Sequence, residues 1–230
     1  MRYDNVREAV FLERPNRFIA RCRMPNGDIL ESHVPNTGRC RELLVPGHRV
    51  YLQFHHDPRR RTPCTLIAVD KGGLLINMDS QAPNRVVEEA LLDGSLSLTK
   101  TAPLVRREFF YHDSRLDFCL EAPGERVYVE VKGVTLEESG VVRFPDAPTE
   151  RGLRHIRELE RAAGEGLGAA VVFVVQMEKA LFFAPNDDTQ PEFGLALRSA
   201  ETAGVRLIAR RCAVTPSEIQ LAEEIPIRLK

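Results

Sequence analysis

Two carboxylates and a lysine lie close together in the middle of the 230-residue chain, on segments with the alternating pattern of β-strands. Asp117 is in the segment Ser114–Glu121, and Glu130 and Lys132 are in the segment Arg126–Lys132. Carboxylate oxygens are hard ligands that suit Mg²⁺ or Mn²⁺. An ammonium group beside them can stabilise negative charge on a phosphate. These residue types fit hydrolysis of a phosphodiester, in which a metal ion activates water and offsets the developing charge.

The spacing predicts that the two segments form an antiparallel hairpin, with its turn centred between Pro123 and Gly124. On the apolar face the pairs are Leu116 with Val131, Phe118 with Val129 and Leu120 with Val127, and on the polar face they are Arg115 with Lys132, Asp117 with Glu130 and Glu121 with Arg126. Like charges directly opposite each other are destabilising, which favours a shared proton or a divalent cation between the carboxylates. Two alternatives stay open. A bulge at the unfavoured Pro-Gly turn would shift the partners, and the charges also fit a solvent-exposed salt-bridge face.

The rest of the chain predicts two domains, 1–80 and 81–230. In the first, Phe18–Arg23 and Ile29–Val34 flank the hairpin turn signal Asn26-Gly27, and about five short strands in all predict a small OB-like β-barrel. In the second we expect an α-β-β-β-α-β-α-β order, a mixed-sheet α/β domain. Its expected elements are a helix over 86–92 with an Asn84 cap, strands over 105–111, 115–121 and 126–134, a helix from the Thr149 cap to Ala163, a doubly covered strand over 169–175, a helix over 193–203 and a strand over 205–210.

Charge is unevenly distributed along a chain whose formal net charge is −1. Basic side chains outnumber acidic ones in residues 1–70, and the reverse holds afterwards. Nearly all the basic residues are arginines, which suit bidentate phosphate contacts, although a GC-rich genome would also produce that bias. The asymmetry indicates that the first domain is the one that meets an anionic partner.

The combination of Asp117 with Glu130-Val131-Lys132 resembles the PD-(D/E)XK nuclease superfamily. More specifically, the chain resembles the sugar fermentation stimulation protein family from about residue 10 to residue 210. The blocks that carry this likeness are His33–Arg39, Ser114–Phe118, Val129–Lys132, Phe144–Ala147 and Thr149–His155. The resemblance implies an OB-like domain followed by a nuclease-like domain. It also implies DNA binding with little sequence preference and a regulatory link to sugar (maltose) metabolism.

For the nuclease-like domain, the resemblance implies a set of site residues. Catalytic roles fall to Asp117, Glu130, Lys132, Arg151 and His155, and the metal site, for Mg²⁺ or Mn²⁺, falls to Asp117, Glu130 and Val131. Arg151 and His155 are four residues apart and share a helix face; a plain helix start is the alternative for both. Glu88 or Glu89 would be a further carboxylate, and both also fit an exposed helix face.

In the first domain, two segments are candidates for holding DNA. The turn that contains His33, Asn36, Thr37 and Arg39 can bind a phosphate through its backbone N–H groups and the arginine, or simply shape the barrel. The loop 55–61 ends in Arg59, Arg60 and Arg61. It either follows a DNA backbone, with salt-sensitive affinity, or is an ordinary solvated loop.

No stretch approaches the roughly 18 apolar residues of a membrane helix. The five cysteines are widely spaced with no CxxC pair, so we expect a reduced cytoplasmic protein. Our leading hypothesis is a metal-dependent DNA endonuclease acting on double-stranded DNA, with a homodimer left open. The alternatives are a non-catalytic DNA-binding regulator linked to sugar metabolism and an RNA-processing enzyme.

Overall fold

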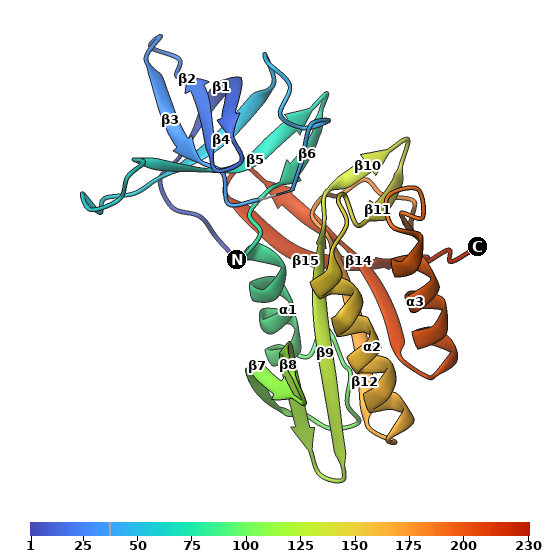
Figure 1. Ribbon diagram of the computed structural model, residues 1–230. Helices are drawn as coiled ribbons and strands as arrows, with labels where there is room; N and C mark the ends of the chain where they lie inside the picture. Colours follow the sequence, from blue (N-terminus) through green and yellow to red (C-terminus); the bar gives the residue numbers. More distant parts are fainter. Residues whose placement is uncertain (37) are drawn as a thin grey trace.

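The computed structural model describes residues 1–36 and 38–230 (Figure 1). The first six strands form the barrel: β1 (Val6–Asn16), β2 (Ile19–Arg23), β3 (Ile29–His33), β4 (Arg49–Phe54), β5 (Cys64–Lys71) and β6 (Leu74–Asn77). Their order is β3-β2-β1-β4-β5-β6, and an additional parallel pairing of β3 with β5 closes the ring. The turn predicted at Asn26-Gly27 joins β2 to β3, with Arg23 paired to Ile29. This confirms the predicted OB-like barrel.

The remaining chain forms the predicted mixed-sheet α/β domain. Its elements are α1 (Ala82–Leu92), β7 (Leu104–Tyr111), β8 (Ser114–Ala122), β9 (Glu125–Val134), β10 (Leu136–Glu138), β11 (Val141–Phe144), α2 (Glu150–Gly164), β12 (Gly168–Val175), β13 (Phe182–Pro185), α3 (Pro191–Thr202), β14 (Arg206–Thr215) and β15 (Glu218–Ile225). The main sheet has the order β15-β14-β12-β9-β8-β7, and β10, β11 and β13 form a small separate sheet. Strands β9, β12 and β14 are parallel. The small sheet and β15 were not predicted from the sequence.

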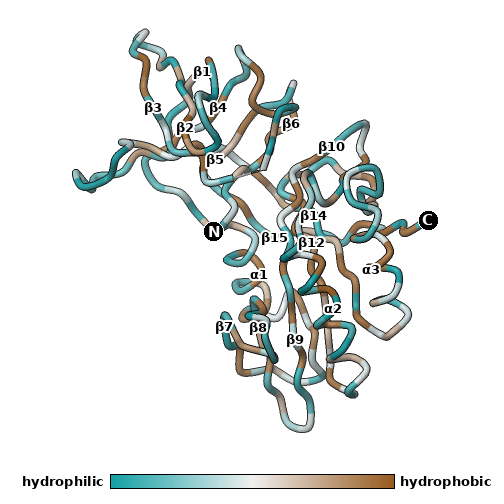
Figure 2. Tube along the Cα trace, viewed as in Figure 1, coloured by the Kyte–Doolittle hydropathy of each residue, from teal (hydrophilic) through white to brown (hydrophobic). Residues whose placement is uncertain are grey.

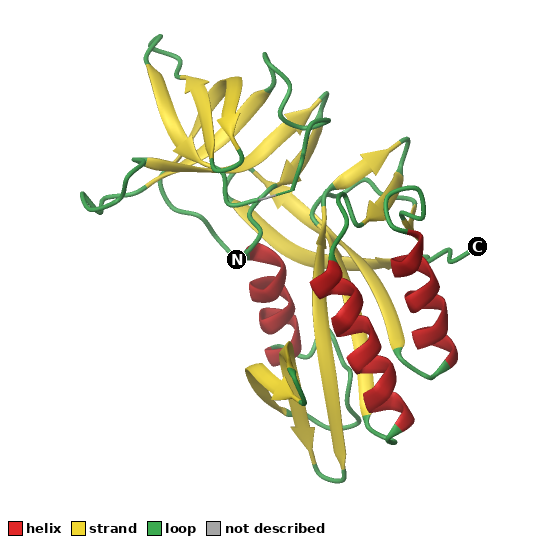
Figure 3. Cartoon of the chain, in the orientation of Figure 1, coloured by secondary structure: helices red, strands yellow, loops and turns green. Residues whose placement is uncertain are grey.

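Helices cover both faces of the main sheet (Figure 3). Val172 and Val174 of β12 pack in the same core cluster as α1, whereas Val171 and Phe173 pack in the cluster of α2 and α3. Strand β12 is therefore apolar along its whole length because both of its faces are buried. Figure 2 shows hydrophobic residues along the central strands and hydrophilic ones in the loops and on the outer helix faces. None of the helices in residues 1–36 and 38–230 is both long and apolar enough to cross a membrane.

The barrel and the α/β domain share their core. One cluster of buried side chains extends from Phe11 and Leu52 in the barrel to Phe173 and Phe193 in the α/β domain. Ile67 of β5 belongs to the second cluster, together with the buried face of α1. This double coverage explains why the first six residues of β5 are all buried.

Polar contacts also join the two domains. Gln176, which is buried just after β12, donates from Nε2 to the backbone oxygen of Asn77 at 3.1 Å and to that of Asp79 at 3.0 Å. Lys71 at the end of β5 forms a 2.6 Å ion pair with Glu137 of β10. These contacts place the barrel directly beyond the carboxyl ends of β9 and β12. In open α/β sheets that end is where ligands bind.

Candidate metal and nucleic-acid site

The hairpin of β8 and β9 has the predicted register as far as the Phe118–Val129 pair. The pairs Leu120–Val127 and Glu121–Arg126 are confirmed, and Gly124 has the positive φ of 73° that the turn requires. The ladder then ends. The predicted pairs of Arg115, Leu116 and Asp117 with residues of β9 do not form. The next backbone N–H of β9, that of Val131, donates at 2.8 Å to Oδ2 of the Asp117 side chain and not to a backbone oxygen of β8.

The predicted apolar face was also wrong for Leu116. Phe118 and Leu120 pack with α1, but Leu116 packs in the cluster of α2 on the other side of the sheet. The register of β7 with β8 places Glu108 opposite Asp117, and Glu108 has a left-handed backbone with φ of 50°. We attribute the switch of faces to this distortion, which interrupts strand alternation at Asp117.

Asp117 is held by two donors. Besides the Val131 amide on Oδ2, Oδ1 accepts from Nδ2 of Asn84 at 2.8 Å. Asn84 is therefore not the cap of α1; Gln81 is the N-cap, and Asn84 lies inside the first turn. Burial, together with the negative charge of Glu130, raises the pKa of the Asp117 carboxyl above its ordinary value. A nearby cation would relieve both effects.

Glu130 is only 3% exposed and has one carboxylate oxygen engaged and one free. Oε1 accepts from Nζ of Lys132 at 2.5 Å and from Nδ1 of His155 at 2.6 Å. Burial by itself raises the pKa of Glu130, but the hydrogen bonds from His155 and Lys132 and the positive charge of Lys132 outweigh it and hold the pKa below its ordinary value. Oε2 is buried, and no residue in the described part of the chain donates to it. A buried ionised oxygen without a donor is costly and indicates that something else binds there.

Helix α2 brings Arg151 and His155 to the site. Thr149 caps the helix as predicted, because its hydroxyl accepts from the backbone N–H of Gly152 at 3.0 Å. Nε of Arg151 donates to Nε2 of His155 at 3.5 Å. In this geometry Nε2 is an acceptor, so the ring proton is on Nδ1, directed at Glu130. The five predicted catalytic residues are thus brought together.

The site fits a divalent cation in its donor set. Asp117 and the free oxygen of Glu130 offer oxygen ligands only, which is what Mg²⁺, Mn²⁺ and Ca²⁺ prefer. Val131 can contribute nothing but its backbone oxygen. Among residues 1–36 and 38–230 no group of three or more His, Cys, Asp and Glu side chains is placed to hold a metal. The two carboxylates are therefore a partial set of ligands for a divalent cation and not an all-protein cage.

We expect the stability of the Glu130→Gln variant to differ from wild type in a pH-dependent way. The folded state lowers the pKa of Glu130, so the ionised form contributes stability that is fully present above the unfolded pKa of about 4.3. That contribution is lost as the pH falls through the folded pKa. At pH 7 the free energy of unfolding should drop by about 1.5–3 kcal/mol, the contribution of a hydrogen bond to a charged group.

Urea denaturation in buffers stepped from pH 7 into acid would measure this difference. The gap between wild type and variant should narrow as the pH falls. Glu178→Gln, at an exposed glutamate, is the matched control and should show a small and constant gap. A difference in unfolding free energy between wild type and Glu130→Gln that stays constant into acid would contradict the lowered pKa of Glu130.

The other predicted carboxylates are occupied elsewhere. Glu88 pairs with Arg107 at 2.9 Å, and Glu89 pairs with the amino group of Met1 at 2.8 Å. Both carboxylates therefore serve surface ion pairs.

The predicted DNA-binding residues fall into two groups. Thr37 lies outside the described residues. Asn36 and Arg39 form a loop at the junction with the α/β domain, where the backbone N–H of Arg39 donates to Oδ2 of Asp146 at 3.2 Å. Arg14 shapes this loop by donating to the backbone oxygens of Asn36, Gly38 and Arg39 at 2.9, 3.0 and 2.9 Å. Asn36, Gly38 and Arg39 are thus anchored to Arg14 of the barrel, and Arg39 also contacts the second domain.

The second group surrounds the β4–β5 loop. His33 belongs to this group. Burial and the positive charge of Arg60 lower the pKa of the His33 imidazole. Arg60 donates to Oγ1 of Thr65 at 3.2 Å, and Arg59 pairs with Asp57 at 3.0 Å. Arg61 is exposed. This loop projects from the barrel away from the α/β domain (Figure 1).

Sequence reasoning missed Asn84 as a partner of Asp117, and it missed Gln176 as the link between the domains. Neither residue belongs to a recognisable motif. Asp146 lay in a block that carried the family likeness, which was the one available signal for it.

The fold and site together define a class of two-domain protein: an OB barrel followed by a mixed-sheet α/β domain with an Asp and a Glu-x-Lys on its central hairpin. Residues 12–78 match the family described as the SfsA N-terminal OB domain, and residues 81–218 match the sugar fermentation stimulation protein RE domain. The chain belongs to the sugar fermentation stimulation protein (SfsA) family.

Full-length relatives support this assignment. The chain is 46% identical over 229 residues to a sugar fermentation stimulation protein homolog of Ruminiclostridium cellulolyticum and 48% identical over 231 residues to one of Clostridium perfringens, with 100% of each chain covered. A solved structure of Pyrococcus furiosus SfsA in complex with Ca²⁺ is similar over 99% of this chain and 98% of that one, with a TM-score of 0.89 and 27% identity.

Proposed function

We propose that this protein is a divalent-metal-dependent nuclease that binds DNA with little sequence preference and hydrolyses its phosphodiester bonds. The observation that carries the proposal is the free, buried Oε2 of Glu130 beside Asp117, which has a raised pKa. Both carboxylates lie next to Lys132 in the order Asp…Glu-x-Lys of the PD-(D/E)XK nucleases. The Ca²⁺ complex of the Pyrococcus relative supports a divalent cation in this family.

The side chains divide the work of hydrolysis among them. A bound Mg²⁺ or Mn²⁺ would offset the charge that develops on the phosphate. Asp117 and Glu130 hold the negative charge that attracts such a cation, and Asn84 and His155 fix the orientation of these two carboxylates. Lys132 orients the attacking water or stabilises the negative transition state. Arg151, exposed at the start of α2, would contact a phosphate of the DNA.

A second candidate function is a non-catalytic DNA-binding regulator connected with sugar metabolism. One observation favours it: the ammonium group of Lys132 is already paired with Glu130 at 2.5 Å, which reduces its availability for catalysis. In that case the same charges would only grip the DNA backbone.

Plasmid nicking decides between the two. Supercoiled plasmid is incubated with the protein in Mg²⁺, Mn²⁺ or EDTA, and gel shifts are run on the same samples. The site-dead control is the double variant Asp117→Ala/Lys132→Ala. We expect nicking in metal, none in EDTA and none with the double variant, while DNA binding persists in all three. Binding without nicking in either metal, or nicking that survives in the double variant, would leave the regulator as the better account.

A further inference from the structure

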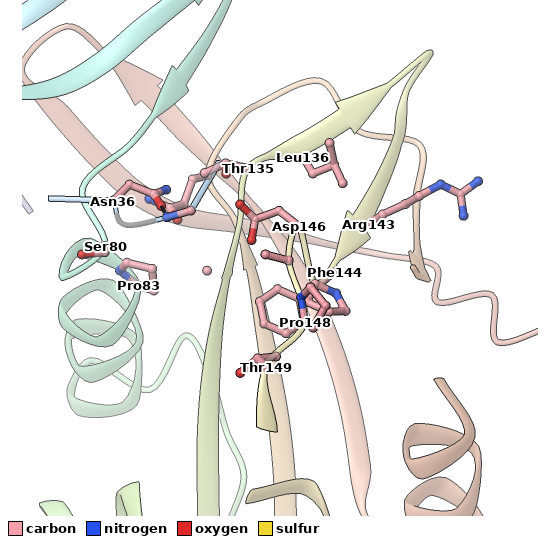
Figure 4. A pocket seen from close by; sticks show the side chains of 15 residues that line it. Asn36, Ser80, Pro83, Thr135, Leu136, Arg143, Phe144, Asp146, Pro148 and Thr149 are labelled. Atoms are coloured by element: carbon pink, nitrogen blue, oxygen red, sulfur yellow. Dashed lines mark hydrogen bonds between the residues drawn. The ribbon is translucent and has the colours of Figure 1, made fainter. Parts of the chain in front are cut away.

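A pocket of about 420 Å³ lies where the barrel meets the α/β domain (Figure 4). The barrel contributes the loop at Asn36, α1 contributes its start, and the α/β domain contributes the segment from Arg143 to Thr149. One wall is formed by Phe144, Pro145 and Pro148, and polar groups of Asn36, Asp146 and Gln176 also line the space. Neither domain alone forms this pocket.

The pocket adjoins the proposed nuclease site on three elements. Pro83 in its lining precedes Asn84, the residue that holds Asp117. Gly133 directly follows Lys132, and Thr149 caps the helix that carries His155. The same three elements therefore line the pocket and carry Asn84, Lys132 and His155 of the nuclease site.

The polar groups in the pocket offer both a donor and an acceptor. A Cβ placed on Gly38 would lie 2.2 Å from Oδ2 of Asp146 and 2.9 Å from Oδ1 of Asn36, so the two side chains meet around this glycine. Oδ1 of Asn36 accepts from the Gly38 amide and Oδ2 of Asp146 accepts from the Arg39 amide. Among residues 1–36 and 38–230, no group donates a hydrogen bond to Oδ1 of Asp146, and the side-chain amide nitrogen of Asn36 donates to no acceptor.

We propose that this pocket receives one unpaired nucleotide of the strand that the protein binds. The inference rests on the proposed function and narrows its substrate to DNA with a base out of the stack. Pockets of about 300–1,000 Å³ accommodate small molecules of nucleotide size. A base needs apolar surface for its face and paired donor and acceptor groups for its edge. The phenylalanine–proline wall and the Asn36–Asp146 pair supply these, and a base can reach them only when it is out of the duplex stack.

Fluorescence of 2-aminopurine tests the proposal without relying on cleavage. Full-length protein is titrated in EDTA into three DNAs that carry the probe at one position: single-stranded, fully paired, and paired opposite a mismatch. Fluorescence anisotropy of a terminal dye reports binding in the same samples. We expect the probe to change intensity several-fold on binding, and the single-stranded and mismatched DNAs to bind more tightly than the paired one.

Two variants fill the pocket to different extents. Ala147→Trp and the milder Ala147→Leu add side chain to a lining residue without changing charge, and Ala203→Trp at the exposed end of α3 is the control. Ala147→Trp should remove the intensity change and weaken single-strand binding about tenfold, as expected for the loss of one stacked base. Ala147→Leu should have a smaller effect of the same kind.

The pocket assignment would be overturned by binding in the anisotropy titration with no change at the probe, or by pocket-filled variants that behave like Ala203→Trp. Neither depends on whether the plasmid is nicked, so this proposal and the proposed function can fail separately. If a nicking-competent preparation shows the same affinity for all three DNAs, the unpaired nucleotide is likewise ruled out.

Discussion

Replacing Asp117 with alanine should abolish both metal binding and cleavage. The carboxylate is one of the two that face the proposed cation, and burial beside Glu130 raises its pKa, an effect that a neighbouring positive charge would relieve. Changing a residue that merely supports a metal ligand costs about 10–100-fold in metal affinity, so the loss of a ligand should cost about 100-fold or more. Calorimetric titration with Ca²⁺ and Mn²⁺ measures this directly.

Lys132→Ala is the matched comparison, because it should separate binding from chemistry. Lys132 contacts Glu130 but offers no ligand to a cation. Metal affinity should therefore fall by no more than about 10–100-fold, the usual loss for a residue that supports a ligand, which is less than for Asp117→Ala. The rate of cleavage should fall by about 10²–10³, the usual effect of removing one group that stabilises transition-state charge. Lys179→Ala, at an exposed lysine, should change neither quantity. If Asp117→Ala binds metal as wild type does, these carboxylates are not the metal site.

Removing the arginines of the β4–β5 loop should weaken DNA binding and make it less sensitive to salt. Each phosphate contact contributes about 0.9 to the slope of log K against log salt, which is roughly tenfold in affinity at 50 mM salt. The variant with Arg59, Arg60 and Arg61 all changed to alanine should thus lose about 100-fold or more. Anisotropy titrations between 50 and 200 mM salt would measure both effects.

The single variants should not be equal. Arg59 is paired with Asp57 at 3.0 Å, and this acidic neighbour already neutralises part of its charge. We therefore expect Arg61→Ala to lower the salt slope by about 0.9 and Arg59→Ala by less. Equal slopes for the wild type and the triple variant would show that DNA does not follow this loop.

Short-range sequence patterns predicted strand pairing well wherever neighbouring residues alone determine it. The Asn26-Gly27 turn and the period-two alternation of β8 and β9 fixed strand pairing from neighbouring residues alone, and the hairpin register was confirmed from Ala122 to Phe118. The prediction failed at Leu116, because the left-handed conformation of Glu108 on a third strand interrupts the alternation. A distortion of that kind leaves no mark on the sequence of β8 itself.

The candidate site was predicted in its residue types more than in its geometry. The Asp…Glu-x-Lys spacing located the carboxylates, and the family likeness added Arg151 and His155. The hydrogen bond from Asn84 depends on how α1 packs across the sheet, which no local pattern specifies. The separation of Asn36 and Arg39 from the arginine loop likewise follows from the docking of the barrel on the α/β domain. The pocket at the junction of the two domains also results from this docking.

The shared core of the two domains has a consequence for how such a chain is built and changed. Because Phe11 and Phe173 lie in one buried cluster, and Ile67 of the barrel packs in the cluster of α1, neither half is a self-sufficient module. Cutting the chain between β6 and α1 would expose apolar surface on both pieces. The OB barrel here is therefore not a detachable unit, and an exchange between relatives would have to transfer both halves together with the surface that joins them.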